Sequence, residues 1–252
     1  MTARAAKTDE ELAELLSLIE GADSVELKLT IPDEDRRSTV VALGLDPLDA
    51  HLRQVFFLET PELDLNRAGV VVRARRSQGR PDDSVVKLRP VVPSELPAEL
   101  RAHDEFGVEV DAMPGGFVCS ASFKAKTRGV WEAATGDRRL SRLFSKGQRA
   151  FYAEHAPEGL EIDDLSVMGP VMVIKLKTSP EGYERKLVGE LWFYPDGSRI
   201  VELSTKCEPR EAFDVAARTR AYLAGRGINL GGEQETKTRT ALDFFATQLA
   251  GS

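Results

Sequence analysis

The chain has 252 residues but only two cysteines and three histidines, and no apolar run approaches 18 residues. Cys119 and Cys207 stand in no metal-type spacing, which argues against a disulfide framework or a zinc knuckle and favours a reducing, cytoplasmic location. The scattered histidines form no nucleophile–base pair. The lack of long apolar runs argues against a membrane span or an export signal.

A net positive charge is also missing. The formal charge is −7, so the field of the whole molecule does not attract nucleic acid or an anionic membrane, and we expect neither as a partner. Any anion site must therefore be local. Hydrophobic residues make up 42% and charged residues 30%, which is typical of a soluble protein with a substantial core. The oligomeric state is left open, with a homodimer as one option.

Helical spacing of apolar residues marks three parts of the chain. A first helix is predicted over residues 8–20, a helical insert over about 137–156, and two closing helices over about 211–224 and 237–249. Three segments follow from this pattern: an N-terminal helix (1–21), a strand-rich domain carrying the insert (22–210), and C-terminal helices packing on that domain (211–252).

Strict alternation of apolar and polar residues marks the strands. It begins at residues 24–31 and recurs in eight further runs, several of them separated by turn sequences such as those at 78–83 and 194–198. No helices alternate with these strands in the manner of a parallel sheet. The pattern predicts an α+β protein in which eight or nine antiparallel strands form a closed or nearly closed barrel.

Four strands each carry two basic residues on one face. Like charges on one sheet face repel each other, and an anionic ligand relieves that repulsion. The ordinary alternative is that these are the water-facing sides of antiparallel strands, but four such pairs together favour an anion site. The pairs are Arg73 and Arg75, Lys87 and Arg89, Lys124 and Lys126, and Lys175 and Lys177.

Carboxylates occupy the polar positions of other strands. They include Glu26 beside Lys28, Glu190, and Glu202 beside Lys206. Acidic oxygen ligands suit Mg²⁺ or Mn²⁺, which commonly bridge phosphates through one or two carboxylates. Basic and acidic faces together predict a metal-dependent site for a triphosphate-like anion.

Residues 55–76 and 86–89 resemble the CYTH domain of triphosphate tunnel metalloenzymes. The Thr60–Pro61 turn, Leu65 and Gly69 stand where that family's pattern has them, as do the pairs Arg73-x-Arg75 and Lys87-x-Arg89. The resemblance covers about residues 22–206 and a closing segment, 236–239. It implies a closed eight-stranded antiparallel tunnel, a substrate with a triphosphate or polyphosphate group, and Mg²⁺ or Mn²⁺. Residues 144–151 and 202–206 are similar to an actinobacterial branch often called adenylate cyclase.

Two positions depart from the family pattern. The first strand has Ser24 where the family has the first carboxylate of Glu-x-Glu-x-Lys, and Ser204 follows Glu202 where a second late acid is common. Each change removes an oxygen ligand, so a two-metal arrangement is incomplete unless Glu105 or Glu109 supplies the missing group. The sequence leaves that choice open.

The favoured hypothesis is a metal-dependent phosphohydrolase acting on inorganic triphosphate or a nucleoside triphosphate. Glu26 and Lys28 are its candidate catalytic residues, and Glu26, Glu190 and Glu202 its candidate metal ligands. A class IV-type adenylate cyclase and a non-catalytic polyphosphate or nucleotide sensor are the alternatives. The candidate substrate-binding residues are Arg73, Arg75, Lys87, Arg89, Lys124, Lys126, Lys175, Lys177 and Lys206.

Overall fold

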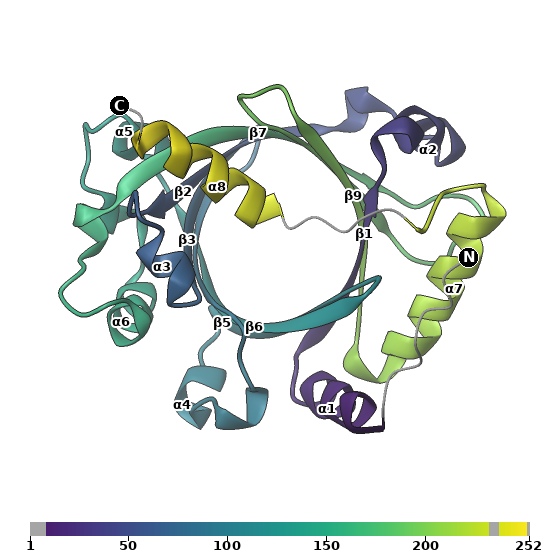
Figure 1. Cartoon of the computed structure of the whole chain (residues 1–252), viewed down its shortest axis with the longest axis horizontal. Coiled ribbons are helices and arrows are strands. Elements are labelled where there is room, and N and C mark those ends of the chain that lie inside the picture. Colours follow the sequence, from purple (N-terminus) through teal and green to yellow (C-terminus); the bar gives the residue numbers. More distant parts are fainter. Residues whose placement is uncertain (1–8, 232–236, 251–252) are drawn as a thin grey trace.

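The computed structural model describes residues 9–231 and 237–250, in which nine β-strands close into a barrel (Figure 1). Thr8, the expected start of the first helix, and Thr236, in the closing segment of the CYTH resemblance, lie outside these ranges. The strands are β1 (Ser24–Ile31), β2 (His51–Glu59), β3 (Val70–Ser77), β4 (Asp82–Leu88), β5 (Phe106–Met113), β6 (Gly116–Thr127), β7 (Ser166–Thr178), β8 (Leu187–Phe193) and β9 (Arg199–Cys207). The helices are α1 (Asp9–Glu20), α2 (Arg36–Ala42), α3 (Asp64–Arg67), α4 (Ala98–Arg101), α5 (Val130–Ala134), α6 (Lys146–His155), α7 (Ala212–Gly225) and α8 (Lys237–Ala250).

The strand order around the barrel is β1-β5-β6-β4-β3-β2-β7-β8-β9, and β9 pairs with β1 to close it. All neighbours are antiparallel except β1 and β5, which run parallel. The predicted α+β class and the closed barrel are confirmed. The predicted eight-stranded, all-antiparallel tunnel is corrected, because a ring in which direction alternates at every step needs an even number of strands. With nine strands, one pair must be parallel.

Glycine turns connect the strands where the sequence predicts hairpins. Gly79 and Gly197 have φ values of 67° and 87° in the connections from β3 to β4 and from β8 to β9. A left-handed backbone costs glycine little because it has no Cβ atom. These turns set the registers of the two hairpins.

The outer face of the sheet is apolar and is covered by helices. Val70, Val72 and Ala74 of β3 are each 1% exposed and join a core that includes Val86 of β4 and Phe151 of α6. Because successive side chains of a strand alternate between faces, the residues between these point into the barrel. The alternation of apolar and basic residues therefore separates a packed exterior from a charged interior.

A buried carboxylate fixes the short helix between β2 and β3. Glu59 is 2% exposed, and its oxygens accept hydrogen bonds from the backbone N–H groups of Thr60, Leu65 and Asn66 at 2.8, 2.9 and 2.8 Å. Two residues after the helix comes Gly69, where φ is +75° and an added Cβ would lie 2.6 Å from the backbone oxygen of Arg89. This position requires glycine, and it aligns the start of β3.

The predicted helical insert is confirmed, although it is split into a 3-10 turn at Leu140–Leu143 and α6. Ser145 and Gln148 form a capping box at the start of α6. Gln148, which is fully buried, donates hydrogen bonds to the backbone oxygens of Ser84 at 2.9 Å and Phe123 at 3.2 Å. These bonds attach α6 to the outside of β4 and β6.

The closing helices lie where the sequence predicts them. Figure 1 shows α7 beside the barrel and α8 lying across part of the ring. Ala241, Leu242 and Phe245 of α8 pack with Trp192 and Phe57 in a second apolar cluster. Among the helices in the described ranges, none is long and apolar enough to cross a membrane.

Candidate functional site

The basic residues predicted from alternating strand positions lie on the inner face of the barrel. Strand β4 runs between β3 and β6. Its residue Asp83 is paired with Arg75 of β3 and Lys126 of β6, and its residue Val85 is paired with Arg73 of β3 and Lys124 of β6. Lys87, Lys175, Lys177 and Lys206 occupy inner positions on β4, β7 and β9. Arg89 lies one residue beyond β4 and is half-buried, and its backbone N–H donates to the carbonyl oxygen of Gly69 at 2.8 Å.

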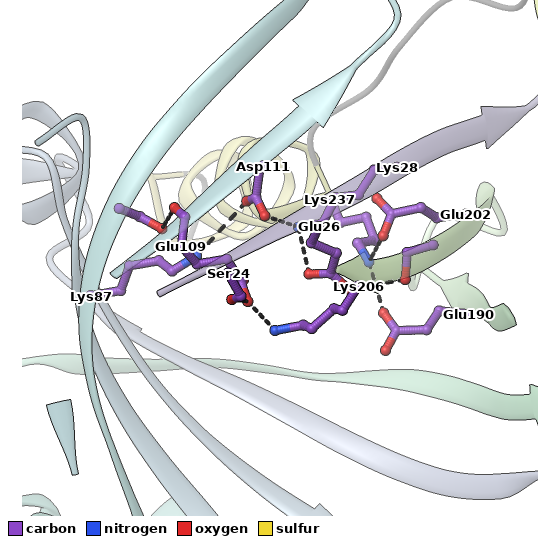
Figure 2. Close-up of polar contacts among 12 residues, drawn as sticks. Ser24, Glu26, Lys28, Lys87, Glu109, Asp111, Glu190, Glu202, Lys206 and Lys237 are labelled. Atoms are coloured by element: carbon purple, nitrogen blue, oxygen red, sulfur yellow. Dashed lines mark hydrogen bonds and ion pairs between the residues drawn. The ribbon is translucent and has the colours of Figure 1, made fainter. Parts of the chain in front are cut away.

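Three carboxylates meet where β1 runs beside β5. The parallel register places Ser24 opposite Glu109 and Glu26 opposite Asp111. One oxygen from each of Glu26, Glu109 and Asp111 lies within 4.8 Å of the others (Figure 2). Three carboxylate oxygens at this spacing suit a divalent ion such as Mg²⁺ or Mn²⁺. Among the described residues, this is the group of acids that could hold a metal ion.

Three lysines surround this acidic cluster. Lys28 Nζ lies 3.4 Å from Glu26 Oε2 and 2.7 Å from Asp111 Oδ1, Lys87 Nζ lies 3.9 Å from Asp111 Oδ2, and Lys206 is ion-paired with Glu109. Asp111 Oδ1 is buried, and the Lys28 ammonium is its partner in the cluster, at 2.7 Å. A metal ion bound here would compete with Lys28 for this oxygen.

These contacts shift the ionisation of the site. Burial would raise the pKa of Glu109, but Lys206 and Lys124 lower it to about 2. Burial would lower the pKa of Lys28, but Asp111 and two glutamates raise it above its ordinary value. For Lys87 the effect of burial is larger than that of Asp111, and its pKa falls to about 8.

The two serines that depart from the family pattern both touch this cluster. Ser204 Oγ donates to Glu26 Oε1 at 3.0 Å, and Ser24 Oγ to Glu109 Oε2 at 3.4 Å. Each serine therefore orients a carboxylate that remains. Of the two acids left open as replacements, Glu109 joins the cluster, whereas Glu105 accepts a hydrogen bond from Ser145 Oγ at 2.8 Å at the start of α6.

The other two predicted metal ligands form a separate group. Glu190 and Glu202 lie opposite each other on β8 and β9, and both are ion-paired with Lys237 at 2.7 and 2.6 Å. Lys175 Nζ also lies 2.6 Å from Glu190 Oε1. Burial would raise the pKa of Glu190, but the two lysines hold it well below its ordinary value.

Comparison with known proteins identifies the architecture. No family model and no curated protein matches the chain. A candidate adenylyl cyclase from Hippeastrum with a dominant triphosphatase activity superposes with a TM-score of 0.65 at 14% identity, over 87% of this chain and 95% of that one. A candidate adenylate cyclase from Bacillus halodurans gives a TM-score of 0.57 at 14% identity, over 86% and 98%.

The chain has a CYTH-like tunnel fold. The substrate-binding residues predicted from sequence divide into two sets inside this tunnel. Those paired with carboxylates are Arg75, Lys87, Lys175 and Lys206. Those that make no hydrogen bond or ion pair through their side chains within the described parts of the chain are Arg73, Arg89, Lys124, Lys126 and Lys177.

One more arginine of the tunnel, which was not among the predicted residues, has an unpaired side chain. Arg53 of β2 lies on the inner face opposite Ser77, and its Nε atom, like that of Arg73, is buried and has no hydrogen-bond partner among the described residues. Burial, and after it the neighbouring charge of Arg75, lower the pKa of Arg73 to about 10. Unpaired buried donors of this kind are costly without a ligand.

Besides Arg53, two residues of the tunnel went unrecognised, Asp111 and Lys237. Arg53 has no second basic residue two positions away on its strand. Asp111 could have been noticed because it lies two residues after Glu109 and therefore on the same face of the strand. Lys237 carried no strand signal because it lies in a helix.

Proposed function

We propose that this protein is a metal-dependent phosphohydrolase that cleaves a phosphoanhydride bond of inorganic triphosphate or a nucleoside triphosphate inside the tunnel. One observation carries this proposal: unpaired cations, among them Arg53 and Arg73, line the same tunnel as a cluster of three carboxylates. Arginines grip phosphate oxygens through parallel hydrogen bonds. The dominant triphosphatase activity of the Hippeastrum protein agrees with this choice.

Glu26, Glu109 and Asp111 are the residues best placed to hold Mg²⁺ or Mn²⁺, with Glu109 and Asp111 in the role expected of Glu190 and Glu202. The exposed Lys206 side chain can leave Glu109, since 52% of it is accessible to solvent. A bound divalent ion supplies Lewis-acid stabilisation of charge on the phosphoryl oxygens.

The chain's own residues supply the remaining chemistry. The phosphate oxygens of the substrate are bound by Arg73, Lys124 and Lys126, which hold its phosphate groups along the tunnel. Glu26, oriented by Ser204, accepts a hydrogen bond from the attacking water, and Lys28 stabilises negative charge that develops on the phosphoryl group. These are the roles proposed for the two candidate catalytic residues.

Two other functions fit the same tunnel. Adenylate cyclase activity differs only in that the ribose 3′ oxygen attacks in place of water, and both similar structures carry that assignment. A non-catalytic polyphosphate or nucleotide sensor is favoured by the charge balance at the acidic cluster, where three lysines face three carboxylates.

The deciding experiment measures phosphate release and cyclic-nucleotide formation from triphosphate, ATP and thiamine triphosphate with Mg²⁺ or Mn²⁺, together with calorimetric binding. We expect metal-dependent phosphate release that Glu109→Gln reduces at least about 100-fold. Glu105→Gln is the matched control, because Glu105 contacts α6, and it should retain activity. Binding without turnover would identify a sensor, cyclic product a cyclase, and absence of binding would refute the tunnel site.

A further inference from the structure

The second acidic group of the tunnel already contains a cation. The ammonium of Lys237 lies between Glu190 and Glu202, with Nζ 2.7 Å from Glu190 Oε2 and 2.6 Å from Glu202 Oε1 (Figure 2). The same nitrogen lies 5.0 Å from the centre of the Trp192 ring, where a cation is attracted to the aromatic face. One ammonium thus joins two carboxylates from neighbouring strands.

Tertiary packing holds this ammonium in place. Lys237 is the first residue of α8, and its carbonyl oxygen accepts a hydrogen bond from the Tyr194 hydroxyl at 3.0 Å. Further along the helix, Ala241 and Leu242 are 0% and 2% exposed against the apolar cluster of β2, β7 and β8. These contacts fix the backbone of Lys237 at the start of α8 and keep its side chain within reach of Glu190 and Glu202.

A second lysine completes the charge balance. Lys175 Nζ lies 2.6 Å from Glu190 Oε1, and Trp192 donates its ring N–H to Glu190 Oε2 at 3.1 Å. Two carboxylates therefore face two ammonium groups in a largely buried position, since only 13% of the Glu190 side chain and 6% of the Glu202 side chain are exposed. A divalent ion at this point would meet two positive charges at contact distance.

One lysine of the other acidic cluster is held less firmly. Lys206, which pairs with Glu109, has a side chain that is 52% exposed, whereas that of Lys237 is 15% exposed. The Lys28 side chain is 16% exposed, but it reaches Asp111 and Glu26 and does not contact Glu109. A metal ion can displace Lys206 from Glu109 more easily than it can displace Lys237 from Glu190 and Glu202.

We propose that Lys237 is a built-in substitute for a second metal ion: the tunnel takes one divalent cation, at Glu26, Glu109 and Asp111, and none between Glu190 and Glu202. This inference rests on the proposed function for the first ion only. The second position is closed by a side chain that the fold delivers from α8.

The test counts Mn²⁺ ions bound per chain without substrate, by calorimetry and by electron paramagnetic resonance. We expect one ion for the natural chain and two for Lys237→Met, because that change leaves two adjacent carboxylates of which only Glu190 keeps a lysine partner, Lys175. Lys237→Arg keeps the positive charge and should bind one ion. Lys146→Met, which alters an exposed lysine of α6, is the matched control and should also bind one.

Two ions in the natural chain, or an unchanged count in Lys237→Met, would overturn the inference. If the natural chain binds no ion and Lys237→Met binds one, the inference stands while the metal site of the proposed function fails. A double variant, Glu190→Gln with Glu202→Gln, tests the same point without altering α8. It should keep the count of the natural chain, and a lower count would overturn the inference.

Discussion

The pKa of Lys87 falls to about 8, chiefly because the side chain is buried. Asp111 raises this pKa and the positive charge of Lys28 lowers it, but both effects are smaller than that of burial. Anion binding favours the charged ammonium, so affinity for triphosphate should be full below this value and fall as pH rises through it. We expect a decrease of up to about tenfold per pH unit, because one proton is linked to binding. Lys87→Arg stays charged and should flatten the dependence. Calorimetric titrations between pH 7 and 10 check this, and equal slopes in both proteins would contradict it.

Ser24 offers a second test at the scale of one residue, since its hydroxyl lies 3.4 Å from Glu109 Oε2. Ser24→Glu adds a carboxylate to a cluster whose three acids are already matched by three lysines. Repulsion should lower the melting temperature without metal ions, and added Mn²⁺ should raise it more than in the natural chain, because the ion gains an oxygen ligand. Thermal melts with and without Mn²⁺ measure the difference. Ser94→Glu, at an exposed position, is the control. Equal gains in both variants would argue against a cation at this cluster.

At the scale of the element, the turn from β2 into β3 depends on Glu59, which accepts three backbone hydrogen bonds. Glu59→Gln replaces one acceptor by an amide donor facing a buried N–H group. We expect a loss of about 1–3 kcal/mol in the free energy of unfolding. Because β3 carries Arg73 and Arg75, triphosphate affinity should fall as well.

Chemical denaturation measures the effect of Glu59→Gln, with Glu62→Gln as the control. Glu62 is exposed, and its change should stay within about 0.5 kcal/mol. Similar losses in the two variants would mean that the three hydrogen bonds do not hold the turn.

The parallel pairing of β1 with β5 is the element-scale feature with the largest consequence for the site. It brings Glu109 and Asp111 beside Glu26. Period-two alternation in the sequence predicts both strands and the inner position of each carboxylate, but it contains no information about which strands become neighbours. For that reason the sequence left open whether Glu105 or Glu109 completes the cluster.

At the scale of the whole molecule, α8 packs on an apolar cluster formed by strands of the barrel. Leu242 is 2% exposed in the cluster that contains Trp192 and Phe57. Leu242→Ala should cost about 2–5 kcal/mol and change the fluorescence of the nearby Trp192. Denaturation followed by fluorescence checks both. Leu249→Ala, at a position 39% exposed on the same helix, should cost far less. An equal cost would show that α8 is not held by this cluster.

The chain as a whole is acidic, yet its tunnel gathers cations. The formal charge of the whole chain is −7, whereas Arg53, Arg73 and Lys124 lie on the inner face of one stretch of the barrel wall, on β2, β3 and β6. Net charge therefore describes the long-range field, and the fold sets the local one.

The sequence by itself determined the strands, the first helix, the helix of the insert and the two closing helices, and the face of each strand on which Arg73, Lys87, Lys124 and Lys175 lie. Each of these depends on spacing along the chain, which the alternation records. That spacing gave no sign of the short helices α2 to α5. Only the tertiary structure decided that nine strands close the ring with one parallel pair, that Asp111 joins Glu26, and that Lys237 reaches Glu190 and Glu202. These facts depend on which strands meet and on how α8 packs, and contacts between distant segments leave no periodic signal in a single sequence.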